Sequence, residues 1–178
     1  MAARATRTAL LVMPLLLTAA ANSVAQEPRP VQDSLGTRRS EWLVGFSVGV
    51  PGYAGEPIPE LRVLPDKYLP HRYAGASGDF NPIHIDKEFA IEVGLPGNIL
   101  HGLYGMAQVA RANSAAVGGD PRALRRLSVQ FRGMALPEQE IVVTGTVREI
   151  ADGRIVVDTE AEQAGKKIIK KGEAELSG

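Results

Sequence analysis

A short stretch between Tyr73 and His84 holds the residues of this chain that are best suited to chemistry. Its sequence, Tyr-Ala-Gly-Ala-Ser-Gly-Asp-Phe-Asn-Pro-Ile-His, places the carboxyl group of Asp79 and the imidazole of His84 on either side of an Asn-Pro pair. Pro82 disfavours a helical backbone at Asn81, so the stretch is predicted to be irregular rather than a regular helix. An acid and an imidazole brought together by such a turn can hold one water molecule and move its protons, which is general acid–base chemistry.

A second candidate feature is the pair His101-Gly102, which opens an apolar segment with helical periodicity. Backbone N–H groups at a helix start carry partial positive charge and can stabilise a developing oxyanion. Gly102 is therefore the oxyanion-hole candidate, because the missing side chain lets a substrate approach closely. A glycine here would equally serve close packing of the helix on a sheet, and both roles can hold together. His101 is predicted to be structural or to support the site.

These residues resemble a known family. The stretch from Tyr73 to Asp86, followed by Gly94-Leu-Pro-Gly and His101-Gly102-Leu, is similar to the signature of the MaoC-like (R)-specific enoyl-CoA hydratases and the related (3R)-hydroxyacyl-ACP dehydratases. The clear resemblance extends from about Leu61 to Val117, and a looser one continues to Leu176. It implies an α+β hot-dog fold, with an antiparallel sheet wrapped around a long central helix. It also implies an Asp/His dyad and no metal or organic cofactor.

The reaction that the resemblance implies is hydration of a trans-2-enoyl thioester to the (3R)-3-hydroxyacyl thioester, or the reverse dehydration. Water must lose a proton as it attacks C3, and C2 must gain one. Neutral His84 is the better base near neutral pH. The resemblance implies that Asp79 holds the water and, when protonated, delivers a proton to C2. The sequence leaves this division of labour open, because two adjacent titrating groups share a proton.

The roles of the neighbouring residues are less tightly constrained. Asn81 is interpreted either as an orienting residue or as a plain turn former. Tyr73 and Phe80, together with His101, are expected to line the acyl-binding site, although aromatic residues near a motif are often core residues. A metal site made by two histidines and the carboxylate of Asp79 is formally possible. Nothing else in the motif indicates a metal, so none is predicted.

Two rival functions and one kind of partner accompany this prediction. A hot-dog thioesterase shares the architecture, but thioesterases of this fold lack the Asp-x-Asn-Pro-x-His arrangement. A non-catalytic acyl-binding subunit of a heterodimeric dehydratase would be expected to have lost Asp79 or His84, and both are present. The expected partners are an acyl-CoA or acyl-ACP thioester and a second hot-dog subunit, in a homodimer or a heterodimer.

The composition and the N-terminal segment limit the possible ligands, chemistry and compartment of the protein. The 20 basic and 20 acidic residues cancel, so the charge does not favour nucleic acid or a membrane surface, and the absence of cysteine excludes thiol chemistry. Residues 1–25 resemble a secretory signal peptide, with Arg4 and Arg7 before an apolar run that is too short to span a bilayer comfortably. Acyl-CoA and acyl-ACP substrates favour the cytoplasm instead, and this is the predicted compartment. Residues 1–40 are predicted to be an N-terminal extension and linker, and residues 41–178 to be one hot-dog domain.

The elements that must position these residues follow from periodicity and turn signals. Residues 58–64 are predicted to form the first strand, residues 66–73 a helical turn, and residues 86–94 a short helix capped by Asp86. The segment 102–117 is predicted to form the long helix, its inner face comprising Leu103, Met106, Ala107, Ala110, Ser114 and Val117. Strands linked by turns at Asp152-Gly153 and Ala164-Gly165 follow. The lysines around Ile168 and Ile169 suggest that the closing strand lies at a sheet edge.

Overall fold

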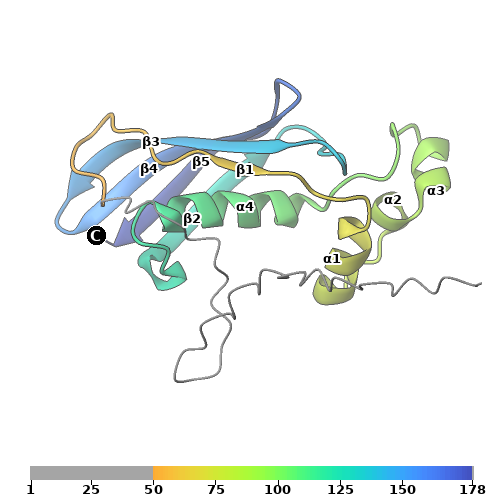
Figure 1. The fold of residues 1–178 in the computed structure, drawn as a ribbon, viewed down its shortest axis with the longest axis horizontal. Coiled ribbons are helices and arrows are strands. Elements are labelled where there is room, and N and C mark those ends of the chain that lie inside the picture. Colours follow the sequence, from red (N-terminus) through yellow and green to blue (C-terminus); the bar gives the residue numbers. More distant parts are fainter. Residues whose placement is uncertain (1–49, 178) are drawn as a thin grey trace, which may run out of the picture. The chain divides into compact units, whose positions relative to one another are not determined.

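The computed structural model describes residues 50–177, which form an antiparallel sheet with a long helix on one face (Figure 1). The predicted signal peptide and linker, and Trp42 to Gly49, lie outside the described residues. No helix within residues 50–177 is long and apolar enough to cross a membrane. The elements in chain order are β1 (Leu61–Val63), α1 (Leu69–Ser77), α2 (Pro82–Ile85), α3 (Lys87–Glu92), α4 (Gly102–Ala115), the 3-10 helix η1 (Pro121–Ala123), β2 (Leu124–Phe131), β3 (Ile141–Ala151), β4 (Arg154–Gln163) and β5 (Lys166–Ser177).

Two tight hairpins build the centre of the sheet, as predicted. Asp152 and Gly153 join β3 to β4 with φ values of 51° and 71°, and Ala164 and Gly165 join β4 to β5 with φ values of 49° and 73°. Two consecutive residues with positive φ give the turn whose twist suits adjacent antiparallel strands. The α+β architecture expected from the sequence is therefore confirmed.

The position of β5 corrects one expectation. The strand order is β1-β3-β4-β5-β2, so β5 pairs with β4 on one side and with β2 on the other. The lysines of β5 therefore do not guard a sheet edge. The cause is a long-range pairing. The strand β2 precedes both hairpins in the chain, but in the sheet it lies next to β5, the last strand of the chain.

The helix α4 packs against the sheet through a different face from the predicted one. Of the six residues assigned to the inner face, only Ser114 is buried, while Leu103 and Ala107 are exposed. The buried residues of the helix are Gly105, Gln108, Val109, Ala112, Asn113 and Ser114. Polar Asn113 can lie inside because its side chain donates to the backbone oxygen of Val109 and to the hydroxyl of Thr159. Small side chains do dominate this face, which lets the sheet approach closely.

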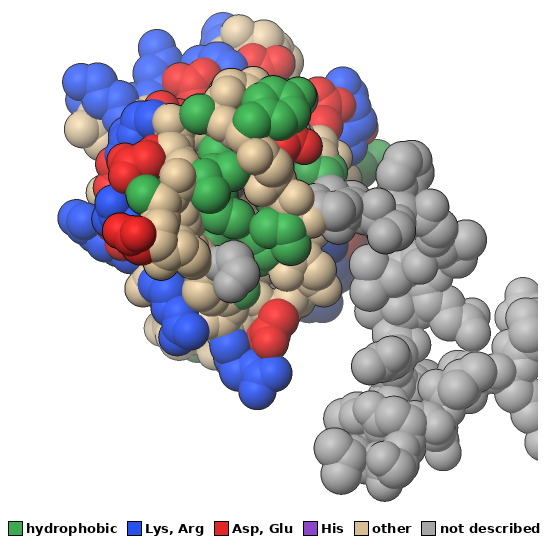
Figure 2. All heavy atoms as spheres, turned by 90° about the vertical axis from the view of Figure 1, so that its left-hand side faces the viewer, with side chains coloured by type: hydrophobic (Ala, Val, Ile, Leu, Met, Phe, Trp, Pro, Cys, Tyr) green, Lys and Arg blue, Asp and Glu red, His purple; other side chains and the backbone are tan. Residues whose placement is uncertain are grey.

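The two ends of α4 differ in character. Near its C-terminus, Figure 2 shows apolar side chains surrounded by lysines, arginines and carboxylates of mixed sign. Near its N-terminus lie α1, α2 and α3 (Figure 1). The candidate site residues are in α1, in α2, in the bend between these two helices and at the start of α4. The site therefore lies at the end of the sheet and helix layer that these three short helices cover.

Candidate active site

Two short helices and the bend between them present the motif. The helix α1 extends through Tyr73 to Ser77, and Pro82 begins α2, so the prediction of an irregular stretch holds only for residues 78–81. Gly78 ends α1 with a left-handed φ of 77°. Pro82 is compatible with a helix because it occupies the first turn of α2, where its missing N–H would have no partner. The corrected picture is a sharp turn between two helices.

His84 is held in one orientation by its own helix and by the chain that precedes α4. The side chain of Asn81 caps α2 by accepting from the backbone N–H of Ile83 at 3.3 Å. His84 is buried, and its Nδ1 lies 2.9 Å from the backbone oxygen of Ile99. A carbonyl can only accept, so Nδ1 carries the proton in neutral His84. The lone pair of Nε2 is consequently available to act as a base.

Asp79 lies on the open side of this imidazole. Its Oδ1 accepts from the backbone N–H of Asn81 at 3.2 Å, while its Oδ2 lies 3.9 Å from Nε2 of His84. The Asp79 side chain is 54% exposed, whereas that of His84 is 10% exposed. The two atoms are too far apart for a direct hydrogen bond, but one water molecule beside them could bond to both. The arrangement is suited to holding and deprotonating water.

His101 supports both members of the pair. Its Nε2 lies 3.0 Å from the backbone oxygen of Asp79, and its ring stacks on that of His84 with centroids 3.9 Å apart. Tyr73 packs against His101 as well, and the centroids of these two rings lie 4.7 Å apart. His101 also precedes the first residue of α4, so one residue joins the Asp79 bend to the start of the long helix.

The three side chains also satisfy the distance requirement for a metal site. One ligand atom from each of Asp79, His84 and His101 lies within 4.8 Å of the others. A metal ion binds an imidazole lone pair, which lies in the plane of the ring. The planes of the two stacked rings are only 25° from parallel, so no point close to both nitrogens lies in both planes. A shared ion would require one ring to turn, which favours acid–base chemistry in this arrangement.

A small cavity adjoins His84 and the start of α4. Its volume is about 130 Å³, and it is lined by His84, Ile99, Leu100, His101, Gly102, Gly105, Phe131, Gly133, Met134, Ala135, Ile168 and Ile169. Gly102 is the first residue of α4, so its N–H is among those that a helix leaves without an intrahelical partner. Tyr73 and Phe80 do not line this cavity, and Phe80 is 60% exposed.

The residues from β2 and β5 in this lining were not identified from the sequence. Phe131 and Ile169 face each other across the β2–β5 pair and close the cavity opposite α4. No local motif marks them, because they come from strands that pair only in the folded sheet. The only signals were the alternating apolar pattern that ends at Phe131 and the apolar pair that includes Ile169, and these indicate a buried face rather than a binding site.

The pKa values of Tyr104 and Asp66, which lie near α1, are shifted. Burial raises the pKa of the Tyr104 hydroxyl, whose ring meets that of Tyr73 edge to face, so Tyr104 stays neutral. A hydrogen bond from the Arg72 guanidinium lowers the pKa of Asp66, which keeps this carboxylate charged. The ion pair of Arg72 with Asp66 helps to fix the start of α1, which leads into the motif.

Comparison with known proteins identifies the family. Residues 56–170 match the model of the MaoC like domain, and the chain belongs to this family. It is 36% identical over 108 residues to the fatty acid synthase beta subunit TOXC of Cochliobolus carbonum, which covers 59% of this chain and 5% of that protein. It is 29% identical over 126 residues to the peroxisomal enoyl-CoA hydratase 2 of Arabidopsis thaliana, covering 70% of this chain and 39% of that protein. The chain thus spans less than half the length of these relatives.

The fold has close structural neighbours. The (R)-hydratase from A. caviae involved in PHA biosynthesis superposes with a TM-score of 0.64 at 20% identity, covering 70% of this chain and 96% of that one. At this identity the likeness establishes the fold, which is the hot-dog fold expected from the sequence.

The cap made by Asn81 leads to a testable expectation. Asn81→Ala removes the acceptor for the N–H of Ile83 and should loosen α2, which carries His84. Loss of such a cap costs about 1 kcal/mol of stability. We expect a lower melting temperature together with a lower kcat for enoyl-thioester hydration. Asn81→Asp keeps the capping oxygen and should restore the melting temperature, whereas equal melting temperatures for wild type and Asn81→Ala would contradict the capping role.

Proposed function

We propose that this chain is a hydro-lyase that hydrates trans-2-enoyl thioesters to (3R)-3-hydroxyacyl thioesters, or catalyses the reverse dehydration. The observation that carries the proposal is the position of Asp79 Oδ2, which lies 3.9 Å from the free Nε2 of His84 beside a cavity at a helix start. Membership of the MaoC like domain family supports it. The similarity to a plant enoyl-CoA hydratase points to the same reaction class.

The proposed mechanism assigns one task to each group. A water molecule hydrogen-bonded to Asp79 and His84 attacks C3 of the enoyl group, and Nε2 of His84 accepts the proton that it loses. Asp79, when protonated, delivers a proton to C2, and the proton that His84 has taken up then passes to Asp79, so that both groups return to their starting states. The negative charge that develops on the thioester oxygen meets the N–H of Gly102, which needs no reorganisation because the helix already fixes it. Asn81 and His101 keep the two reacting side chains in place.

Purified protein with crotonyl-CoA tests the proposal against both rivals. Loss of the enoyl absorbance without release of free thiol is the expected result. Release of thiol would instead indicate a thioesterase, which is the rival that shares this fold. Neither change, together with retained binding of the thioester, would indicate a non-catalytic acyl-binding subunit.

The partner and the compartment are further parts of the proposal. Phe131 and Met134 border the cavity with 50% and 52% of their surface exposed. Large exposed apolar residues beside a site favour coverage by a second subunit. We expect a homodimer or a heterodimer with another hot-dog subunit, acting in the cytoplasm on acyl-CoA or acyl-ACP. Light scattering of the pure chain tests the first expectation, and N-terminal sequencing of the mature protein tests the second.

The floor of the cavity predicts a limit on acyl chain length. A Cβ atom at Gly105 would meet Cδ1 of Ile169 at 3.5 Å, which is ordinary contact, whereas a larger side chain would project into the cavity. Gly105→Leu should lower kcat/KM for 2-octenoyl-CoA about tenfold more than for crotonyl-CoA, because each excluded methylene forfeits about 0.8 kcal/mol of burial. Gly75→Leu, at an open position on α1, is the matched control. Equal losses for both substrates would contradict this use of the cavity.

A further inference from the structure

The helix α2 is a single turn, and its bonds to other segments hold His84 in place. Short helices are unstable alone in water, and the last carbonyl oxygens of a helix have no donor within it. In α2 the oxygen of Pro82 accepts from the N–H of Asp86 at 2.8 Å. The oxygens of the other three residues each accept from a segment outside the helix. These external bonds therefore determine the position of the helix that carries the proposed base.

Two of the external donors come from one short segment, residues 98–100, which we call the clamp. The N–H of Ile99 donates to the oxygen of Ile83 at 3.0 Å. The side-chain amide of Asn98 donates to the oxygen of His84 at 3.1 Å. The oxygen of Ile99 accepts from Nδ1 of His84 at 2.9 Å. The clamp and α2 are thus joined by three hydrogen bonds, two of which involve His84.

The clamp is also fixed on its other side. The N–H of Leu100 donates to the oxygen of Ala135 at 2.7 Å. Gly97, which precedes the clamp, is buried and has a φ of 151°, a backbone conformation that glycine adopts most readily. Ile99 and Leu100 are apolar, so Asn98 is the residue of the clamp whose side chain bonds to α2. A substitution of Asn98 therefore removes one bond to α2 without removing any backbone donor or acceptor.

The clamp decides which nitrogen of His84 can act as the base. Because the oxygen of Ile99 can only accept, it keeps the proton of neutral His84 on Nδ1 and the lone pair on Nε2. If Ile99 moved away, the proton could occupy either nitrogen, and His84 with a proton on Nε2 cannot take one from water. In the other two histidines of the chain, His71 and His101, Nε2 lies 3.0 Å from a backbone oxygen and carries the proton. His84 is therefore expected to be the one histidine in the Nδ1–H form.

We propose that Asn98 is a positioning residue for the general base of the hydration. Its amide holds the clamp against His84, and the clamp keeps the imidazole in the Nδ1–H form with Nε2 toward Asp79. This inference rests on the proposed function. Asn98 does not line the cavity beside His84, so it acts through the imidazole rather than on the substrate. The general base thus depends on a side chain that follows it by 14 residues in the sequence.

His71 separates this role from simple support of α2. From the neighbouring helix α1, its Nε2 donates to the oxygen of Ile85, the last residue of α2. This bond is of the same kind as that of Asn98, but it involves neither His84 nor the clamp. His71→Ala should therefore loosen the end of α2 without releasing the proton of His84. Asn98→Ala should do both.

The test measures the tautomer of His84 directly by nuclear magnetic resonance. The full chain is isotopically labelled in the ring nitrogens of its histidines, and spectra are recorded at about pH 8, where neutral imidazole predominates. One of the three histidine signals of the wild type should show a protonated Nδ1. In Asn98→Ala this signal should change to a mixture of both tautomers, while kcat for crotonyl-CoA falls about fivefold at an unchanged KM. Asn98→Asp keeps the size of the side chain but cannot donate, so it should behave in the same way.

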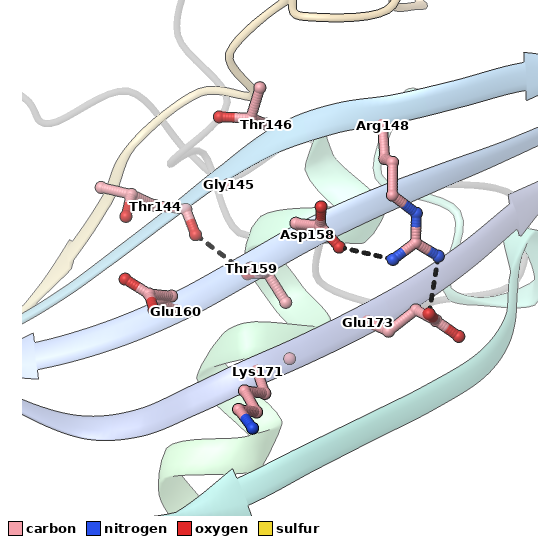
Figure 3. A pocket seen from close by; sticks show the side chains of 10 residues that line it. Thr144, Gly145, Thr146, Arg148, Asp158, Thr159, Glu160, Lys171 and Glu173 are labelled. Carbon is pink, nitrogen blue, oxygen red and sulfur yellow. Dashed lines mark hydrogen bonds and ion pairs between the residues drawn. The ribbon is translucent and has the colours of Figure 1, made fainter.

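The matched control removes a side-chain bond to a backbone oxygen away from the site. The hydroxyl of Thr159 donates to the oxygen of Thr144 at 3.0 Å, beside the hollow drawn in Figure 3. This hollow shares no lining residue with the cavity at His84. Thr159→Val keeps the shape of the side chain but loses that bond, so it should lower the melting temperature at least as much as Asn98→Ala. It should leave the tautomer of His84 and the value of kcat as in the wild type.

Two results would overturn this inference, and a third would overturn only the proposed function. The same His84 tautomer in Asn98→Ala as in the wild type would refute the positioning role, whatever the activity. An equal mixture of tautomers in His71→Ala and Asn98→Ala would also refute it, because any loosening of α2 would then be sufficient. If the wild type hydrates no enoyl thioester while Asn98→Ala still changes the tautomer, the proposed reaction fails and the positioning of the imidazole stands. Should Asn98→Ala not fold, Asn98→Asp gives the same comparison.

Discussion

Replacing Asp79 by asparagine is expected to lower kcat for enoyl-thioester hydration about a thousandfold while the protein stays folded. A positioned acid or base contributes about 10² to 10⁴ to a rate. Asparagine keeps an oxygen that can accept from the N–H of Asn81, and the backbone oxygen that meets His101 is unchanged. The amide cannot deliver a proton to C2, so chemistry should be lost without structure. Initial rates with crotonyl-CoA, together with a thermal melt, measure both quantities.

A variant of His84, the other member of the dyad, makes this test stricter. If Asp79 and His84 act on one water molecule, His84→Gln should cost about as much as Asp79→Asn, and the double variant little more than either, since groups that act as a unit are not additive. Asp152→Asn is the matched control, because it makes the same chemical change in the β3–β4 turn, where asparagine also tolerates a positive φ. An Asp79→Asn enzyme with the kcat of the wild type would disprove the assigned dyad.

Local signals in the sequence predicted the elements of the fold better than their arrangement. Asp152-Gly153 marks a hairpin because few residue pairs tolerate two positive φ values. The position of β2 beside β5 depends instead on contacts between distant residues, and no local pattern near Leu124 or Lys166 records it. The inner face of α4 was misassigned for a related reason. Polar Asn113 is buried by virtue of a hydrogen bond to Thr159 on a distant strand, while apolar Leu103 is exposed.

The candidate site likewise combines features that the sequence predicted with features that only the fold shows. Asp79 and His84 are brought together by a few residues of turn, so their proximity was predictable from the sequence. The contact of His101 with the backbone of Asp79, 22 residues away, and the stacking of His101 on His84 emerge only from the fold. The roles of Tyr73, Phe80, Asn81 and Gly102 in catalysis remain predictions, although the structure places Gly102 at the start of α4 as expected.

Removal of the backbone N–H of Gly102 is expected to give the second large effect on kcat. Gly102→Pro should reduce kcat about a hundredfold relative to Gly102→Ala, because proline lacks the N–H that is proposed to meet the thioester oxygen. Loss of one donor of this kind costs about 10² to 10³ in kcat. Proline is well tolerated at the first position of a helix, where Gly102 lies. His101 also has the extended backbone, with φ of −61° and ψ of 133°, that a following proline requires.

The alanine variant separates the loss of the donor from the added bulk. A Cβ atom at position 102 would lie 3.3 Å from Cε1 of Phe131, a ring that is half exposed and can yield by a few tenths of an ångström. Gly102→Ala should therefore keep most of its activity, and both variants should melt close to the wild type. Equal kcat values for the alanine and proline variants would show that the N–H does not stabilise the transition state. In that case Gly102 would serve only close packing against Phe131, and the oxyanion would have to be stabilised by another group beside the cavity.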